Sequence, residues 1–216
     1  MLRICSALVL ICAGLPVWAE ITGRIRVIDG DTFDVGQTRV RLYAIDAPEQ
    51  DQSCLTQQGA AFACGQWASA QVAARFGGAR ATCTRIEIDR YGRTVAKCRA
   101  RGVDMGQEIV AQGWAFAYRR YGMDYDLDEK TAYVADRGLH GYRVQSPAAF
   151  RKNRATGRIS ADPACRIKGN ISKSGRIYHL PGQEFYEQTM INTDRGERWF
   201  CSVTDARKAG WRPARR

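Results

Sequence analysis

The chain has 216 residues, of which 45% are apolar and 25% are charged, and its formal net charge is +11. This composition is that of a globular protein, and it excludes a disordered or collagen-like chain. The length accommodates one ordinary domain, or one domain and a small module, with a buried core. The positive charge favours polyanionic partners.

The first nineteen residues are typical of a targeting segment. A short positively charged start at residues 1–3 precedes an apolar run at residues 4–17. Val17 and Ala19 are small residues at the two positions that signal peptidase recognises. This pattern predicts a signal peptide over residues 1–19, cleaved after Ala19. An uncleaved membrane anchor is the alternative, but the run is shorter than the about 20 residues that span a bilayer. We therefore expect an exported protein, periplasmic or extracellular.

Six cysteines remain after removal of the signal peptide, and an even number in an exported protein predicts disulfides. Two β-like runs flank a four-residue loop at 89–92, and in such a hairpin Cys83 and Cys98 face each other. Metal binding is the competing interpretation, but the chain has no CxxC pair, which disfavours zinc. Cys54 and Cys64 are expected to pair next, because they are close in sequence. Cys165 and Cys201 are then left to pair with each other. The predicted pairs are Cys54–Cys64, Cys83–Cys98 and Cys165–Cys201.

The pattern of apolar residues predicts three antiparallel strands, at residues 21–28, 32–35 and 38–45. The Ala- and Gln-rich segment 55–76 predicts a helix that ends at a Gly-Gly pair. If Cys54 and Cys64 pair, that helix must begin after about Gln57, because on one continuous helix the two residues would be ~15 Å apart. The remaining expected elements are strands at 81–88 and 94–100, a helix at 103–112, an extended segment at 114–118 and a helix at 126–136. This order predicts an α+β fold that is mainly β, an OB-type five-stranded β-barrel with three helices.

Charge is divided unevenly along the chain. Residues 20–143 hold 17 basic and 16 acidic side chains, whereas residues 144–216 hold 15 and 6. Residues 144–162 combine Ser, Pro, Ala and Gly with basic residues and little periodicity, which predicts a linker. Residues 163–216 are then a small basic C-terminal module. Its charge suits nucleic acid or anionic cell-surface polymers, although a merely solvated module is the alternative.

Four carboxylates fall within 21 residues, at the ends of strands that are expected to pair: Asp29, Asp31, Asp46 and Glu49. Clustered carboxylates repel one another unless a cation compensates them. A hard divalent ion takes oxygen ligands of this type. The alternative is simple turn formation, because Asp-Gly-Asp-Thr is favourable turn sequence.

Two arginines favour a catalytic site over a set of turns. Arg41 lies in the middle of an apolar strand, where an unpaired charge destabilises the fold. Arg93 follows Tyr-Gly at a hairpin tip, from which it can reach over a site. Guanidinium groups bind phosphate oxygens in two-point contacts. Carboxylates, a hard ion and two arginines together indicate phosphoryl cleavage.

Several spaced motifs make residues 26–137 similar to the staphylococcal (micrococcal) nuclease family. They are Ile-Asp-Gly-Asp-Thr at 28–32, Arg-Leu at 41–42, Ile-Asp-Ala-Pro-Glu at 45–49, Asp-Arg-Tyr-Gly-Arg at 89–93 and Gln-Gly-Trp-Ala at 112–115. The resemblance covers about half of the chain and makes residues 20–143 a nuclease domain. It implies an OB barrel with three helices and Ca²⁺-dependent cleavage of single-stranded DNA and RNA that leaves 3′-phosphate ends. Mg²⁺ and Mn²⁺ are alternative ions, because they accept the same oxygen ligands.

The resemblance also assigns roles to individual residues. Asp31, Asp46 and the backbone carbonyl of Ala47 match the metal ligands, and the usual Thr hydroxyl at position 47 is absent. Glu49 matches the residue proposed as general base. Arg41 and Arg93 match the phosphate-binding arginines. The residues expected to contact the nucleotide or stack on a base are Tyr91, Tyr118 and Tyr121.

The C-terminal module resembles the Cys-rich modules of the Ada repair protein, in a form that has lost its zinc ligands. Gln183 stands where a Cys is expected, and a Cys165–Cys201 disulfide replaces the metal. We expect a monomer. The alternatives to an active nuclease are an inactive nucleic-acid-binding barrel and a surface-attachment protein that acts through its basic tail. Retention of all five residues Asp31, Arg41, Asp46, Glu49 and Arg93 favours the enzyme.

Overall fold

The computed structural model describes residues 20–173 and 175–215. The predicted signal peptide at residues 1–19 lies outside the described residues. Within the described part of the chain, no helix is both long enough and apolar enough to cross a membrane.

Five strands close into a barrel. β1 pairs antiparallel with β2 and β7, β2 with β3, and β7 with β8, while β3 and β8 pair in parallel and complete the circle. This closed barrel confirms the predicted OB-like fold, and it removes the unpaired edges that an open sheet would leave. The barrel strands are β1 (Ile21–Val27), β2 (Thr32–Val35), β3 (Thr38–Leu42), β7 (Arg80–Ile88) and β8 (Thr94–Ala100).

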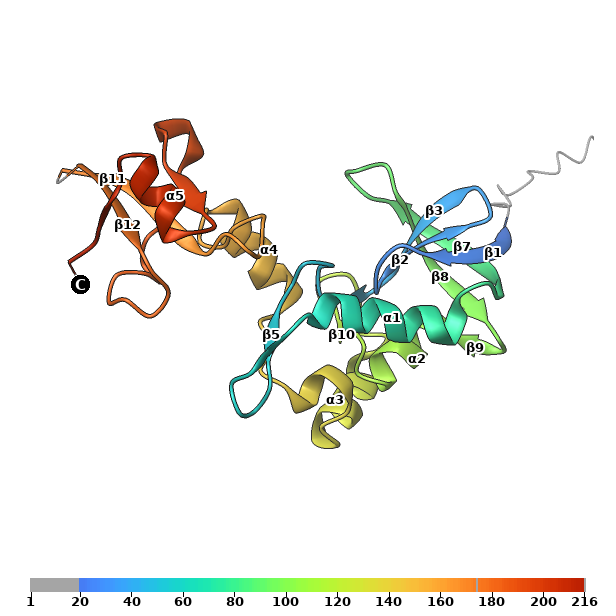
Figure 1. The fold of residues 1–216 in the computed structure, drawn as a ribbon. Helices are drawn as coiled ribbons and strands as arrows, with labels where there is room; N and C mark the ends of the chain where they lie inside the picture. The colour runs from blue at the N-terminus through green and yellow to red at the C-terminus, as the bar shows by residue number, and fades with distance from the viewer. Residues whose placement is uncertain (1–19, 174, 216) are drawn as a thin grey trace, which may run out of the picture.

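α1 and α2 pack on the barrel, and α3 packs on α2 (Figure 1). Phe33 and Leu42 of the strands pack with Phe76 of α1 and Ile109 of α2 in one core, and all four are buried. Burial of each such side chain stabilises the fold by about 1.5–3 kcal/mol. The helices are α1 (Cys64–Phe76), α2 (Met105–Ala111) and α3 (Asp126–Val134), accompanied by the short elements β4 (Ile45–Asp46), β9 (Val103–Asp104), β10 (Phe116–Ala117) and η1 (Gly138–Gly141).

The start of α1 differs from the prediction. The expected helix from Leu55 was wrong for its first nine residues, because Cys54 and Cys64 form a disulfide with a Cα–Cα distance of 5.5 Å. The residues between them instead form a two-stranded hairpin, β5 (Cys54–Leu55) and β6 (Ala61–Phe62). The helix then begins at Cys64 itself.

The β7–β8 hairpin joins Cys83 to Cys98 as expected, but its turn is longer than the predicted four residues. Ile88 pairs with Thr94, so the loop has five residues, and a bulge between Arg85 and Glu87 shifts the register back by one. The extra residue in the bulge compensates the extra residue in the loop. Cys83 and Cys98 therefore still face each other, and they form a disulfide.

The predicted linker contains a helix, α4 (Pro147–Ala155), which the sequence pattern did not predict. The Ser146 side chain accepts a hydrogen bond from the Ala149 N–H, and Pro147 occupies the first turn. Both features favour a helix start. Lys152 and Arg154 lie in the last turn, where positive charge suits the helix dipole.

A second, smaller sheet follows α4, and Figure 1 shows it on the far side of α4 from the barrel. Its strand order is β13-β11-β12-β14, and Tyr178, Phe200 and Trp211 pack in its own core. The Cys165–Cys201 disulfide belongs to this module. Its elements are β11 (Ile167–Ser172), β12 (Gly175–His179), η2 (Thr193–Arg195), β13 (Arg198–Phe200), α5 (Val203–Lys208) and β14 (Arg212–Pro213). The resemblance of this module to the Ada module stays a prediction.

Candidate active site

Asp31 and Asp46 lie together beneath Arg41. The Arg41 Nη2 atom is 3.0 Å from Asp31 Oδ2 and 3.1 Å from Asp46 Oδ1, so one positively charged nitrogen bridges both carboxylates. Both carboxylates are almost fully buried, at 4% and 3% exposure. Two buried negative charges at this separation require a cation, and here the guanidinium provides it. Burial lowers the pKa of Arg41, but Asp31 and Asp46 outweigh this effect and raise it above its usual value.

Strand pairing brings these residues together. Asp31 lies in the turn before β2, and Arg41 pairs across β2 and β3 with Thr32. The backbone of Ala44 has a φ of 57°, a left-handed conformation that ends β3 and redirects the chain into β4, which contains Asp46. The Ala47 N–H then donates to Asp31 Oδ2 over 3.1 Å, which places residue 47 beside the first carboxylate.

Asp29 supports the turn and does not contact Arg41. Its Oδ1 atom accepts a hydrogen bond from the Asp31 N–H over 3.0 Å. Burial, and next the charge of Asp31, raise the pKa of Asp29 to about 6. A divalent ion at Asp31 would offset this repulsion and favour the ionised form of Asp29.

Glu49 lies in the loop after β4, and its side chain is 31% exposed. The loop is fixed by Gln52, whose side chain is fully buried and donates to the backbone oxygen of Gln145 over 2.7 Å. It is fixed also by Gly65, because a Cβ atom there would lie 1.7 Å from the Glu49 carbonyl oxygen. Only a glycine at the start of α1 therefore allows the loop to approach so closely. Glu49 is a fixed carboxylate that water can reach.

Arg93 lies at the tip of the β7–β8 hairpin. Its Nε atom is 2.7 Å from Asp89 Oδ2, and Asp89 also accepts hydrogen bonds from the backbone N–H groups of Tyr91 and Arg93. Backbone hydrogen bonds to Asp89 thus hold the loop in place, and the Arg93 side chain is 30% exposed. The guanidinium keeps donors free to contact a phosphate, since its ion pair occupies one of five N–H groups.

One cleft of about 1350 Å³ gathers most of the predicted site residues. Tyr91 is 67% exposed at its rim, and the rings of Tyr118 and Tyr121 pack with centroids 5.2 Å apart. Asp46 is in contact with Arg41, but it lies behind the lining. The predicted residues that line the cleft are Asp31, Arg41, Ala47, Glu49, Tyr91, Arg93, Tyr118 and Tyr121.

Arg151 of α4 is a charged residue of the site that the sequence did not predict. Its Nη1 and Nη2 atoms are each 3.0 Å from one oxygen of Asp46, and Nη1 is 2.8 Å from Glu49 Oε1. Burial lowers the pKa of Arg151, but its hydrogen bonds to Asp46 and Glu49 raise it above its usual value. No local pattern predicts a contact between residues 46 and 151, because the basic residues of α4 resemble those of a solvated linker.

The donor set of the site fits a hard divalent ion. Asp31 and Asp46 offer carboxylate oxygens, and Ala47, whose N–H contacts Asp31, has a backbone carbonyl of the same ligand type. The bridging nitrogen of Arg41 marks a position where a cation is within hydrogen-bond distance of both carboxylates. Among the described residues, Asp162, Cys165 and Cys201 also cluster tightly, but the disulfide occupies both sulfur atoms.

A closed five-stranded barrel with carboxylates and arginines in one cleft defines the class of the protein as a barrel nuclease. The family model described as Staphylococcal nuclease homologue matches residues 39–139. The chain belongs to this family, and it is a nuclease by that membership.

Three relatives illustrate the similarity. The succinoglycan biosynthesis protein ExoI of Rhizobium meliloti (strain 1021) is 34% identical over 153 residues, which cover 67% of this chain and 75% of the relative. The micrococcal nuclease of Shigella flexneri is 35% identical over 139 residues, which cover 58% and 74%. An uncharacterized endonuclease of Escherichia coli O157:H7 is 36% identical over 124 residues, which cover 54% and 74%.

Proposed function

We propose that this nuclease is exported, requires Ca²⁺, and hydrolyses single-stranded DNA and RNA to products that end in 3′-phosphate. Mg²⁺ and Mn²⁺ are the alternative ions. The observation that carries the proposal is the pair of buried carboxylates, Asp31 and Asp46, bridged by Arg41 on the wall of an open cleft. The three disulfides support export, because such bonds persist in oxidising compartments.

The proposal gives chemical tasks to the predicted site residues. Glu49 accepts the proton of the attacking water, since it is a fixed carboxylate that solvent reaches. Arg41 and Arg93 donate to the phosphoryl oxygens and stabilise the charge that develops on them. Asp31 and Asp46 would hold a divalent ion, which would neutralise phosphate charge and orient the scissile bond. Tyr118 and Tyr121 offer a surface for an unpaired base.

Cleavage of single-stranded DNA and RNA by the oxidised protein, with Ca²⁺ and with EDTA, tests the proposal. We expect Ca²⁺-dependent cleavage with 3′-phosphate products, which a phosphatase that removes 3′-phosphates will detect. Succinoglycan belongs in the assay as a further substrate, because one relative is named for its biosynthesis. A folded protein that binds single-stranded DNA but cleaves it with none of Ca²⁺, Mg²⁺ or Mn²⁺ would instead be an inactive binding barrel.

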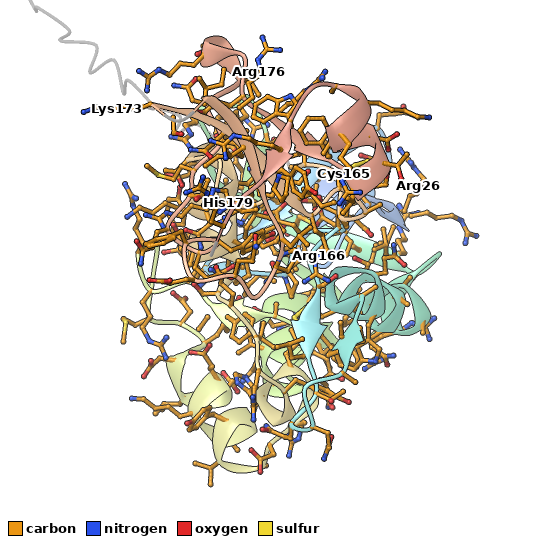
Figure 2. All side chains as sticks on the ribbon, turned by 60° about the vertical axis from the view of Figure 1, so that its left-hand side comes forward. Arg26, Cys165, Arg166, Lys173, Arg176 and His179 are labelled. Carbon is orange, nitrogen blue, oxygen red and sulfur yellow. A yellow bond between two sulfur atoms is a disulfide. The ribbon has the colours of Figure 1, made fainter. Side chains whose placement is uncertain are left out.

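The basic C-terminal module is proposed to attach the protein to anionic polymers of the cell surface. Residues 163–216 hold 11 basic and 5 acidic side chains. Lys173 and Arg176 are exposed on the β11–β12 hairpin (Figure 2). Side chains at such a position can neutralise charge along a polyanion and release its counterions.

A pair of charge variants separates tethering from cleavage. The double variant Lys173→Ala/Arg176→Ala is expected to elute from a dextran sulfate column at lower salt than the wild type, with unchanged kcat on a short oligonucleotide. The matched control is Arg80→Ala/Arg99→Ala, which removes two exposed charges from the barrel instead. Equal elution of the two variants would show that net charge alone, and not the module, determines attachment.

A further inference from the structure

Arg151 contacts Asp46, one of the two carboxylates that would hold a divalent ion, and also Glu49. Its guanidinium contacts both oxygens of Asp46, each at 3.0 Å, and reaches Glu49 Oε1 at 2.8 Å. Arg41 adds a second donor to Asp46 Oδ1. Oδ1 of Asp46 therefore has two charged donors and Oδ2 has one, so an ion that binds Asp46 competes with a guanidinium at either oxygen.

Arg151 is the guanidinium that can leave. Its side chain is 38% exposed, whereas that of Arg41 is 15% exposed within the barrel wall. A long side chain at the mouth of a cleft reaches solvent by rotating about its own bonds, without any change in the barrel. Withdrawal of Arg41 would instead break its contacts with both Asp31 and Asp46, two buried carboxylates whose charges it compensates.

Several contacts dock α4 on the barrel and keep Arg151 close to the site. Arg143 and Leu55 exchange two backbone hydrogen bonds, at 2.8 and 3.1 Å. Arg154 pairs with Asp51 at 2.5 Å, and Phe150 is buried beside it. A tethered group has a high effective concentration at its target, so even a weak intramolecular ion pair competes with a ligand from solution.

We propose that Arg151 is an internal competitor of the metal ion. It neutralises Asp46 and Glu49 in the metal-free protein, the ion displaces it, and α4 thereby sets the ion affinity of the site. The inference deepens the proposed function and rests on its metal dependence. It gives residues 147–155, which lie outside the family match at 39–139, a direct part in the site.

Calcium titration of the oxidised full chain, by calorimetry without nucleic acid, tests this proposal. We expect Arg151→Ala to bind Ca²⁺ about 10-fold more tightly than the wild type, since a positive charge in direct contact with the ligands is removed. The matched control is Lys152→Ala, which removes the same charge from an exposed neighbour on α4. Its affinity should change by about two-fold or less, because solvent screens that charge. Equal or weaker binding by Arg151→Ala than by Lys152→Ala would overturn the proposal.

Melting temperatures give a second readout that does not depend on catalysis. Without metal, Arg151→Ala should melt below the wild type, because Asp46 and Glu49 lose a counterion. Saturating Ca²⁺ should narrow this gap, since the ion replaces the lost charge and binds the folded state. A gap of the same size with and without Ca²⁺ would assign Arg151 a purely structural role.

The outcomes also separate this inference from the proposed function. Tighter Ca²⁺ binding by Arg151→Ala in a protein that cleaves no nucleic acid would support the inference and contradict the proposed activity. Metal-dependent cleavage by the wild type, together with an unchanged Ca²⁺ affinity in Arg151→Ala, would support the proposed activity and contradict the inference. If neither the wild type nor Arg151→Ala binds Ca²⁺, Mg²⁺ or Mn²⁺, both fail.

Discussion

Replacement of Glu49 by Gln is expected to lower kcat for phosphodiester cleavage by about 10²-fold or more. The two side chains have nearly the same shape, and Gln keeps an oxygen that can accept the hydrogen bond from Arg151. The substitution therefore removes the capacity to accept a proton without removing a contact that holds the loop. The measurement is single-turnover cleavage of a single-stranded oligonucleotide at saturating Ca²⁺, with circular dichroism to confirm the fold.

Glu87→Gln is the matched control, because Glu87 also lines the cleft but lies on β7, away from Asp31 and Asp46. We expect it to change kcat by less than about three-fold, in line with a charge that solvent screens. Near-normal turnover in Glu49→Gln would remove Glu49 from the proton-transfer step, and the water would then need another base. A fall in kcat of equal size in both variants would indicate that turnover depends on the net negative charge of the cleft and not on Glu49 as a base.

Replacement of Arg93 or Arg41 by Ala also tests the proposed chemistry, but the Arg41 variant is expected to lose stability as well as activity. Arg93→Ala should also lower kcat by about 10²-fold. Its loop is expected to persist, since backbone N–H groups bind Asp89 without the side chain. Arg41→Ala removes the cation that bridges two buried carboxylates, so the metal-free protein should lose stability as well as activity. Arg93→Ala therefore reports on chemistry more directly.

The barrel could be predicted from sequence because each strand carries its own signal. Alternation of apolar residues, Asp-Gly turns and a Gly-Gly helix end are local, and they place the five strands and the end of α1. The third strand was predicted to continue to residue 45, but β3 ends at Leu42, because Ala44 adopts a left-handed conformation that turns the chain. The start of α1 was wrong because a disulfide overrides helix propensity between Cys54 and Cys64. The hairpin loop was one residue too short because no residue type marks the bulge at Ile86.

The site shows the same division between local and distant information. Its carboxylates and Arg41 lie on β3 and β4 or in the turns next to β2 and β4, so the pairing of β2 with β3 and the short connections between these elements bring them together. Arg151 comes from a segment about a hundred residues further along, and its ion pairs with Asp46 and Glu49 leave no periodic trace in the sequence. The helix signals were present, since Ser146 and Pro147 are a favourable helix start. The basic, Ala-rich composition outweighed them and was interpreted as a linker.

Loss of the Cys83–Cys98 disulfide is expected to lower the free energy of unfolding of the barrel by about 3 kcal/mol. The bond closes a loop with a sequence separation of 15, and the chain-entropy model assigns about this value to a loop of that length. The corresponding fall in melting temperature is about 10 °C for a domain of this size. Calorimetry of the double variant Cys83→Ala/Cys98→Ala measures the effect.

The matched control is Cys165→Ala/Cys201→Ala, which removes a disulfide from the C-terminal module and should leave the barrel transition unchanged. Amide exchange along β7 and β8 assigns the transition, because these strands lie in the barrel alone. Equal melting of the barrel in both double variants would contradict a stabilising role for Cys83–Cys98. The disulfide also joins β7 and β8 at the pair Cys83–Cys98, on the side of the Ile86 bulge that is away from the hairpin tip. If its loss increases exchange at the tip near Arg93 and lowers kcat at a temperature where the barrel is folded, the bond also positions the phosphate-binding arginine.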